Sequence, residues 1–391
     1  MKIVYFLHTA SATDGSSKAF IHLIEKMISI GVCPLVILPR HGDMCLFLEK
    51  RNIKYIILHW EVRPSTYPWM QTFKDKLLFI PRLFGRLFVN TFATLQSIYI
   101  VHKFQPRIIH SNTSVLAIGY YTASFLNIPH IWHIREYGAL DFNYYYYYPS
   151  RKKQLQRYKQ KDSYSISITK DIQQYNALAE WRNSKVIYDG VLSVNMTHYQ
   201  SNKDNYFLFV GSLSKAKGVL PLIRAYADYC KNIDYPLPLF IAGDGSDEYK
   251  QQILDVLNKS RITDQVTLLG LTKDVLPLYQ KAKALIVPSL SEGFGFITAE
   301  AMFSGCLVIG NNTAGTKEQF DNGKEITGEE IALRYTTQEQ LVQHLIDVTN
   351  NNTDYYEPMI LRAQQVVAQL YSTESHAENV YNFYKEILAN Q

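Results

Sequence analysis

Short β-rich segments alternate with helical segments along nearly the whole of this 391-residue chain, and this alternation limits the folds that the chain can adopt. It predicts stacked βαβ units, in which a parallel sheet is covered by helices on both faces. The first series of predicted strands lies at 3–7, 35–38, 55–58, 108–110, 131–133, 165–168 and 186–188. The second lies at 206–210, 239–242, 266–269, 284–287 and 307–309. Two α/β domains follow from the two series.

The polar stretch 195–205 separates the two series and has little apolar periodicity, which is typical of a linker. We therefore expect an N-terminal domain over 1–195, a C-terminal domain over 205–370 and a cleft that opens beside the linker. After Pro358 the pattern is helical to the end, with apolar residues recurring on one face. This pattern predicts a terminal helix over 371–391 that packs back on the N-terminal domain.

Composition excludes several classes of protein. Hydrophobic residues make up 47% and charged residues 19%, so disorder is excluded, and a net charge of +5 does not by itself imply nucleic-acid binding. The four cysteines are too sparse for a disulfide scaffold or a zinc site. The chain shows no secretion signal, and its most hydrophobic region, 77–101, is interrupted by polar and charged residues. We expect a cytoplasmic protein.

The segment from Pro288 to Met302 carries the most chemical information. A predicted strand ends at 287, a glycine-bearing turn follows, and a helix begins around Phe296. Free backbone N–H groups and the positive end of a helix dipole at such a turn favour anion binding. Glu292 lies in the turn and Glu300 inside the helix, so their carboxylates can accept hydroxyl groups from different parts of one polar ligand.

Two more glycine turns follow strands in the same half of the chain. Gly211 and Ser212 open a loop that contains Lys215 and Lys217, whose ammonium groups suit phosphate oxygens. Taken alone, this segment is equally compatible with a solvated loop. Gly243 opens the third turn. Because ligands of open α/β sheets collect at the carboxyl ends of the strands, the three turns are predicted to line one pocket.

Together these segments resemble the retaining glycosyltransferases of family 4. Glu292 and Glu300 match the family's E-x7-E motif, and further similarity lies in VGSLSKAKG at 210–218, IAGDG at 241–245 and KVIYDGV at 185–191. The resemblance implies the GT-B fold, two Rossmann-like domains around a deep interdomain cleft. It also implies a hexosyltransferase of bacterial polysaccharide biosynthesis that needs no metal or other cofactor. Such an enzyme moves a sugar, with retention, from a nucleotide sugar to a lipid-linked or polysaccharide acceptor.

The resemblance also assigns roles. Glu300 would hold the ribose hydroxyls, Glu292 a hydroxyl of the transferred sugar, and Lys217 the diphosphate. Backbone amides near the sugar and the diphosphate would come from Phe294, Gly295 and Phe296. Gly211 and Gly243 would let the backbone approach the donor. Ser212 stands where the family usually has Arg, and the loss of that guanidinium removes a bidentate phosphate contact unless Lys215 replaces it.

Two residues of the N-terminal domain complete the predicted site. Gly15, in the loop after the first strand, would lie close to the donor phosphates, although the family often has two glycines there. His133, at the end of a strand, resembles a family histidine at the interdomain cleft, and a purely structural histidine is the alternative. Glu292, His133 and Lys217 are thus the predicted catalytic residues, and no residue is predicted to bind a metal.

Basic and aromatic residues gather in the acceptor-side domain. Six basic residues and one acidic residue lie between 64 and 107, interleaved with aromatic residues, and 151–161 adds six more basic residues. This pattern is typical of contact with an anionic membrane, so we expect a peripheral position on the inner face of the plasma membrane. A solvated helix face over a core stripe is the alternative for each stretch. Nucleic acid is disfavoured because no recognition motif accompanies the charge. The tyrosine run 144–148 fits a sugar, the membrane interface or a plain loop.

Two alternatives stay open. A nucleotide-sugar epimerase on the same fold would share the donor site, and a non-catalytic donor-binding partner of a membrane assembly would keep binding without turnover. An NAD-dependent oxidoreductase is disfavoured, because the loop HTASATDG after the first strand lacks the G-x-G-x-x-G pattern.

Overall fold

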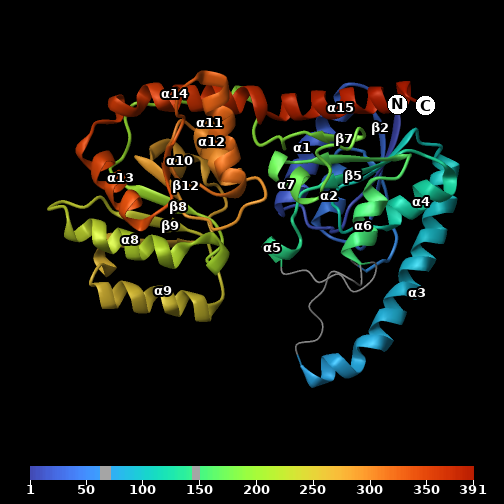
Figure 1. The fold of residues 1–391 in the computed structure, drawn as a ribbon, viewed down its shortest axis with the longest axis horizontal. Coiled ribbons are helices and arrows are strands. Elements are labelled where there is room, and N and C mark those ends of the chain that lie inside the picture. Colours follow the sequence, from blue (N-terminus) through green and yellow to red (C-terminus); the bar gives the residue numbers. More distant parts are fainter. Residues whose placement is uncertain (62–71, 143–149) are drawn as a thin grey trace. The chain divides into compact units, whose positions relative to one another are not determined.

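The structure is a computed structural model that describes residues 1–61, 72–142 and 150–391. The chain forms two compact units (Figure 1). The first unit consists of Met1–Gly190 and Thr373–Gln391, and the second of Val191–Ser372. The tyrosine run 144–148 and the beginning of the basic stretch 64–107 fall outside the described residues.

The first unit is built on a seven-stranded parallel sheet with the strand order β3-β2-β1-β4-β5-β6-β7. Its strands are β1 (Lys2–Phe6), β2 (Cys33–Leu38), β3 (Lys54–Ile57), β4 (Ile108–Ser111), β5 (His130–Ile134), β6 (Ser163–Ser167) and β7 (Ser184–Val186). Every residue of the central strands β4 and β5 is buried. Burial in these two strands includes the polar side chains of His110, Ser111, His130 and His133.

Helices cover this sheet. They are α1 (Gly15–Ser29), α2 (Asp43–Lys50), α3 (Phe73–Phe104), α4 (Ile118–Leu126), α5 (Ala139–Phe142), α6 (Arg151–Tyr158), α7 (Lys170–Tyr175) and α15 (Thr373–Ala389). The C-terminal helix α15 belongs to the first unit and packs against α1 (Figure 1). Val380 and Phe383 of α15 share one apolar cluster with Phe20 and Leu23 of α1.

Helix α3 is unusual because most of it lies on the surface. A capping box formed by Thr72 and Asp75 starts it, and only Ala93, Ser97 and Val101 are buried. Figure 1 shows its N-terminal part projecting past the sheet of the first unit. Among the described residues, no helix has both the length and the apolarity needed to cross a membrane.

The second unit contains a six-stranded parallel sheet with the order β10-β9-β8-β11-β12-β13. Its strands are β8 (Phe207–Val210), β9 (Leu239–Ala242), β10 (Val266–Gly270), β11 (Ala284–Val287), β12 (Leu307–Asn311) and β13 (Leu333–Tyr335). Its helices are α8 (Val219–Lys231), α9 (Asp247–Ser260), α10 (Leu276–Lys281), α11 (Phe296–Phe303), α12 (Ala314–Thr327), α13 (Gln338–Asn350) and α14 (Thr353–Leu370), with short 3₁₀ turns η2 (Val194–Met196), η3 (Lys215–Lys217) and η4 (Thr263–Gln265).

The chain passes between the units at 190/191 and again at 372/373. The stretch 195–205, which the sequence predicts as a linker, instead packs on the second unit. The backbone N–H of His198 donates to the carbonyl of Phe303 at 2.9 Å, and Lys203 Nζ donates to the carbonyl of Gln280 at 2.6 Å. The polar residues that made the stretch look like a linker are therefore used to attach it.

Candidate active site

The glycine turns after β8 and β9 touch through their backbones. A Cβ atom on Gly243 would lie 1.8 Å from the carbonyl oxygen of Gly211, and one on Gly245 would lie 2.3 Å from that of Leu213. Gly211 and Gly243 also have φ angles of 149° and 154°, which residues with side chains rarely adopt. Glycine is therefore required at both turns, because only it allows the two strand ends to approach so closely.

The turn after β11 joins the same group. Gly218, which caps α8 with a φ of 69°, would place a Cβ atom 2.0 Å from the carbonyl oxygen of Pro288. The N–H of Leu290 donates to the carbonyl of Ala216 at 2.9 Å. Since β8 lies between β9 and β11 in the sheet, the three turns that the sequence singles out are neighbours at its carboxyl edge.

Lys217 and Glu292 form an ion pair across these turns. Lys217 Nζ lies 2.5 Å from Glu292 Oε1, and Ser289 Oγ donates to the same oxygen at 2.8 Å. The Lys217 side chain is 29% exposed and that of Glu292 12%, so the pair is partly shielded from water. The predicted phosphate-binding cation and the predicted sugar-binding acid thus meet at one place.

A buried tyrosine donates a hydrogen bond to the carboxylate of Glu300. Glu300 lies in α11, and Tyr279 Oη in α10 donates to Glu300 Oε2 at 3.1 Å. Burial, and next the neighbouring Glu300 carboxylate, raise the pKa of Tyr279 well above its usual value. The phenol therefore stays protonated and remains a donor, which orients the carboxylate of Glu300.

The loop that carries Phe294, Gly295 and Phe296 is fixed by α12. Gln319 Nε2 donates to the carbonyls of Phe294 and Gly295 at 2.6 and 3.0 Å, and Gly295 caps α11 with a φ of 89°. The N–H of Gly315 donates to the carbonyl of Glu292 at 2.9 Å, and a Cβ atom there would lie 2.7 Å from the carbonyl oxygen of Phe294. The start of α11 and Glu292 are thus positioned by one helix.

Three of these supporting residues escape sequence reasoning. Tyr279, Gln319 and Gly315 lie in helices whose residue pattern is ordinary. The small residues of Ala314-Gly315-Thr316 at the start of a helix are the one signal that points to a close backbone approach. Nothing in the sequence near Tyr279 indicates its contact with Glu300.

Ser212 and Lys215 lie at the outer side of the same loop. Both are exposed, and the Ser212 hydroxyl lies 3.4 Å from that of Ser214. Lys215 begins the 3₁₀ turn that contains Lys217. That Lys215 replaces the arginine expected at position 212 stays a prediction.

The two predicted site residues of the first unit differ in their surroundings. Gly15 begins α1, and a Cβ atom placed on it would meet nothing within 4 Å. His133 in β5 is fully buried, with its Nδ1 3.1 Å from His110 Nε2 and 3.3 Å from an Arg135 nitrogen. In this structure the imidazole of His133 has no exposed surface with which to touch a substrate.

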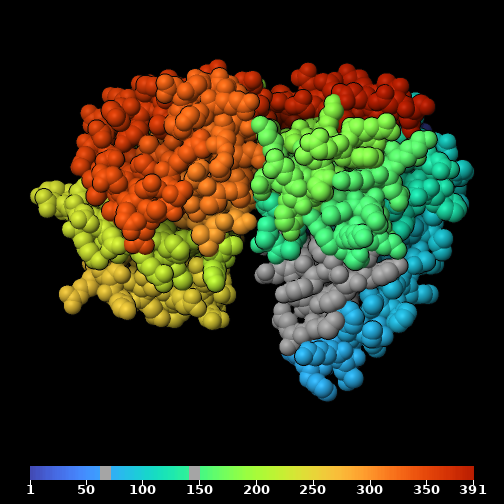
Figure 2. All heavy atoms as spheres, in the orientation of Figure 1, coloured from blue at the N-terminus to red at the C-terminus, as the bar shows by residue number. Residues whose placement is uncertain are grey.

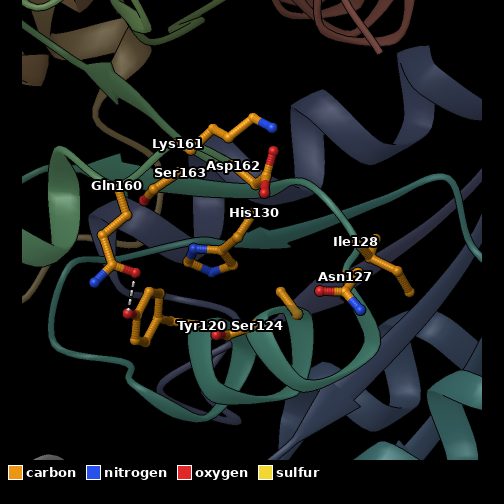
Figure 3. A pocket seen from close by; sticks show the side chains of 10 residues that line it. Tyr120, Ser124, Asn127, Ile128, His130, Gln160, Lys161, Asp162 and Ser163 are labelled. Atoms are coloured by element: carbon orange, nitrogen blue, oxygen red, sulfur yellow. Dashed lines mark hydrogen bonds between the residues drawn. The ribbon is translucent and has the colours of Figure 1, made fainter.

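A separate pocket lies in the first unit, with a volume of about 300 Å³ (Figure 3). His130, the first residue of β5, and Ser163, the first of β6, line it, and Tyr120 Oη donates to Gln160 Oε1 at 2.6 Å. It therefore lies at the amino edge of the sheet, whereas Gly15 follows the carboxyl end of β1. Ligands of such sheets bind at the carboxyl edge, so this pocket is not part of the predicted site.

Comparison with known proteins gives these observations a context. Residues 197–366 match the family described as glycosyl transferases group 1. The chain is 26% identical over 217 residues to an uncharacterized glycosyltransferase of Methanocaldococcus jannaschii, MJ1607, with 51% of this chain and 53% of that protein aligned. It is 30% identical over 119 residues to the N-acetylgalactosamine-N,N'-diacetylbacillosaminyl-diphospho-undecaprenol 4-alpha-N-acetylgalactosaminyltransferase of Campylobacter jejuni, over 30% of this chain and 31% of that protein. The chain thus spans about half the length of the first relative and a third of the second.

The similarity to solved structures extends over both units. Alr3699/HepE of Anabaena, solved in complex with UDP, has a TM-score of 0.77 at 17% sequence identity, over 99% of this chain and 100% of that chain. The fold of the protein is GT-B, with two parallel-sheet Rossmann-like α/β domains.

Proposed function

We propose that the protein is a glycosyltransferase that moves a hexose from a nucleotide sugar to a lipid-linked or polysaccharide acceptor, with retained configuration and without a metal. The observation that carries this proposal is the pairing of Lys217 with Glu292 where the turns after β8 and β11 meet. Further support comes from the UDP named with the Anabaena structure and from the undecaprenol diphosphate in the name of the Campylobacter relative.

In the proposed donor complex, Glu300 accepts hydrogen bonds from the ribose hydroxyls and Glu292 from a hydroxyl of the transferred sugar. Lys217 and the N–H groups at the start of α11, from Phe294 to Phe296, face the diphosphate. Tyr279 supports this assignment because it keeps the Glu300 carboxylate oriented before the nucleotide arrives. An oriented acceptor loses less entropy on binding than a free side chain does.

The main task in this transfer is to stabilise the negative charge that develops on the leaving nucleoside diphosphate. Lys217 and the helix start supply positive charge for it. We propose front-face displacement, in which the bond from the anomeric carbon to the phosphate oxygen breaks and the acceptor oxygen bonds to the same face. The acceptor proton passes to the leaving phosphate oxygen. Glu292 does not act as the nucleophile in this scheme, since Lys217 and Ser289 already engage its Oε1.

The experiment that tests this function measures nucleoside diphosphate release from UDP-, GDP- and dTDP-sugars, with and without a polyprenyl-diphosphate-linked sugar. We expect diphosphate release that depends on the acceptor and persists in EDTA. The product formed from an α-linked donor should itself be α-linked. Interconversion of the donor without acceptor would identify an epimerase instead. Donor binding with neither transfer nor slow hydrolysis would identify a non-catalytic partner.

Peripheral membrane contact through α3 is part of this proposal, and an apolar stripe along the exposed face of the helix supports it. The stripe residues recur every three or four positions and are between 55% and 84% exposed: Phe73, Leu77, Ile80, Phe84, Phe88, Phe92, Leu95 and Tyr99. In Figure 2 this segment, in light blue, forms outer surface of the first unit. An apolar face of this length on a surface helix is suited to insertion among lipid headgroups.

The cations of α3 favour anionic lipid as the partner of the apolar stripe. Five cations lie along the same helix: Lys74, Lys76, Arg82, Arg86 and Lys103. Its one acid, Asp75, is paired with Arg82 at 2.9 Å. Two residues of the stripe, Phe88 and Phe92, line a groove of about 340 Å³ together with Ile57, the last residue of β3, and the next residue, Leu58. We propose that this groove accepts part of the acceptor's hydrocarbon chain.

The second basic stretch, 151–161, contributes less to this surface. Arg157 in α6 is buried and donates to Tyr121 Oη at 2.6 Å, and Arg151 donates to Asn176 Oδ1 at 3.0 Å. Two of its six cations are therefore used inside the unit.

A further inference from the structure

Two histidines and an aspartate converge inside the first unit, away from the candidate donor residues. They are His133 in β5, Asp189 after β7 and His376 in α15, and each is at most 1% exposed. Asp189 Oδ1 lies 3.7 Å from His133 Nε2 and 3.8 Å from His376 Nε2. One ligand atom from each residue lies within 4.8 Å of the others.

The atoms that face one another in this cluster lack hydrogen-bond partners. Within the part of the chain that the structure describes, this holds for His133 Nε2, Asp189 Oδ1 and His376 Nε2. Arg135 pairs with Asp189 through the other carboxylate oxygen, Oδ2. Buried polar atoms are nearly always satisfied, so three such atoms, one from each residue and within 4.8 Å of one another, are suited to a cation.

The order of protons in the neighbouring hydrogen bonds leads to the same result. Tyr384 Oη donates to Tyr5 Oη at 3.3 Å, so its oxygen accepts from His110 Nδ1, which lies 2.6 Å away. A neutral His110 then has a bare Nε2, which accepts from His133 Nδ1 at 3.1 Å. His133 Nε2 then carries no proton, and its lone pair faces Asp189 Oδ1.

Arg135 fits this order of protons. Its NH2 group lies 3.3 Å from His133 Nδ1 and equally 3.3 Å from Asn112 Oδ1. With a proton on His133 Nδ1, the guanidinium donates to Asn112 and to Asp189 Oδ2. Asp189 Oδ1 is then left without a hydrogen-bond donor.

We propose that His133, Asp189 and His376 bind a single divalent transition-metal ion of the zinc class. Two imidazole nitrogens and one carboxylate oxygen are ligands that zinc prefers, at roughly 2.0–2.2 Å each. The separations of 3.7 and 3.8 Å need to shorten only slightly to meet around one ion.

The ion would connect three segments of the first unit that are distant in the sequence. Asp189 immediately precedes Gly190, the last residue before the chain first leaves this unit, and His376 follows its return at Thr373. A Cβ atom on Gly190 would lie 2.8 Å from Thr373 Cα, so the two crossing segments already touch. The proposed role is to fasten both segments to β5.

The test uses the full chain stripped of metal with a chelator and then titrated with Zn²⁺ by calorimetry and with Co²⁺ by visible spectroscopy. We expect one ion per chain, an intense Co²⁺ d–d spectrum of low coordination number, and a higher melting temperature on loading. His376→Asn and Asp189→Asn should each weaken binding by at least about 100-fold. His102→Asn, at an exposed histidine of α3, is the matched control and should bind as the wild type does.

Absence of stoichiometric binding, or equal binding by the cluster variants and the control, would overturn the proposal. If a cluster variant does not fold, X-ray absorption on the zinc-loaded wild type decides. Scattering from two imidazoles supports the site, whereas an all-oxygen shell or one imidazole rejects it. None of these readouts involves a donor sugar, so this proposal and the proposed transferase activity can fail separately.

Discussion

Lys217 Nζ and Glu292 Oε1 lie 2.5 Å apart, so the cation and the acid proposed for the donor neutralise each other in the absence of ligand. A bound diphosphate would have to compete with Glu292 for the ammonium group. The two side chains are therefore expected to respond differently to mutation, although they form one contact.

Lys217→Met should weaken nucleoside diphosphate binding by about 10- to 100-fold, the scale of one charge-assisted contact. Glu292→Gln should leave that binding unchanged or tighter, because it releases Lys217, while sugar transfer falls. Calorimetry with the diphosphate and a transfer assay with the full donor separate these effects. Equal weakening in both variants would show that the pair acts only as a structural link.

Tyr279→Phe removes the phenol that donates to Glu300 at 3.1 Å. We expect the donor KM to rise roughly 10-fold with little change in kcat, because a hydrogen bond to a charged group contributes about 1.5–3 kcal/mol and only orientation is lost. Tyr335→Phe, another buried tyrosine of the same unit, is a control for hydroxyl loss. A KM equal to that of the wild type would show that the orientation of Glu300 by Tyr279 does not contribute to donor binding.

Gly243→Ala should destabilise the second unit strongly, since its Cβ atom would lie 1.8 Å from the carbonyl oxygen of Gly211. Gly15→Ala is the matched comparison, because nothing lies within 4 Å of the added atom. Thermal unfolding should therefore show a large decrease in melting temperature for the first variant and almost none for the second. Reduced donor use by a stable Gly15→Ala protein would support the proposed position of phosphates near Gly15.

Phe84→Glu combined with Phe88→Glu should abolish binding to vesicles that contain phosphatidylglycerol, because both rings are exposed on the α3 stripe, at 67% and 76%. Leu271→Glu, at an 81% exposed leucine of the second unit, should bind as the wild type does. Vesicle sedimentation at low and high salt measures both variants. Unchanged sedimentation together with a shift from dimer to monomer would mean that a second copy of the chain covers the stripe.

His8 gives the first unit a pH dependence with a defined sign. Burial, opposed by the nearby Asp14 charge, lowers the pKa of His8 to about 4 in the folded chain. The unfolded chain, with an ordinary histidine pKa of about 6.5, binds more protons between these values, so stability should fall as pH drops through that window. Four other buried histidines of this unit, His110, His130, His133 and His376, also have lowered pKa values. His8→Gln should therefore make this part of the curve of melting temperature against pH less steep, and substitution of the exposed His41 should not.

Strands with continuous apolar runs could be found from the sequence because both faces of the two sheets are covered. β13 was missed, since Leu333–Tyr335 is short and contains Arg334, whose charge is compensated by Glu330 at 2.7 Å and by Asp321. A charged residue in a short run hides the strand until the partner from another segment is known. The contact between Tyr279 and Glu300 could not be predicted either, because the two residues lie in different helices.

The three glycine turns could be placed at one sheet edge because parallel topology brings carboxyl ends together. The position of the linker could not be predicted, because polar residues at 195–205 look alike whether solvent or the carbonyls of Phe303 and Gln280 accept their hydrogen bonds. His133 is predicted as a catalytic residue from its resemblance to a family histidine, with a structural histidine as the alternative. Its proximity to Asp189 and His376 could not be predicted, because these residues come from segments far along the chain.

Helix α15 completes the first unit although the whole of the second unit, Val191–Ser372, separates it in sequence from the rest of the first. During translation, the first unit therefore cannot bury the α1 face that α15 covers until Thr373–Ala389 has left the ribosome. The second unit, which is continuous in sequence, can fold earlier. A nascent chain stalled before Thr373 should consequently expose the apolar side chains of Phe20 and Leu23 to chaperones.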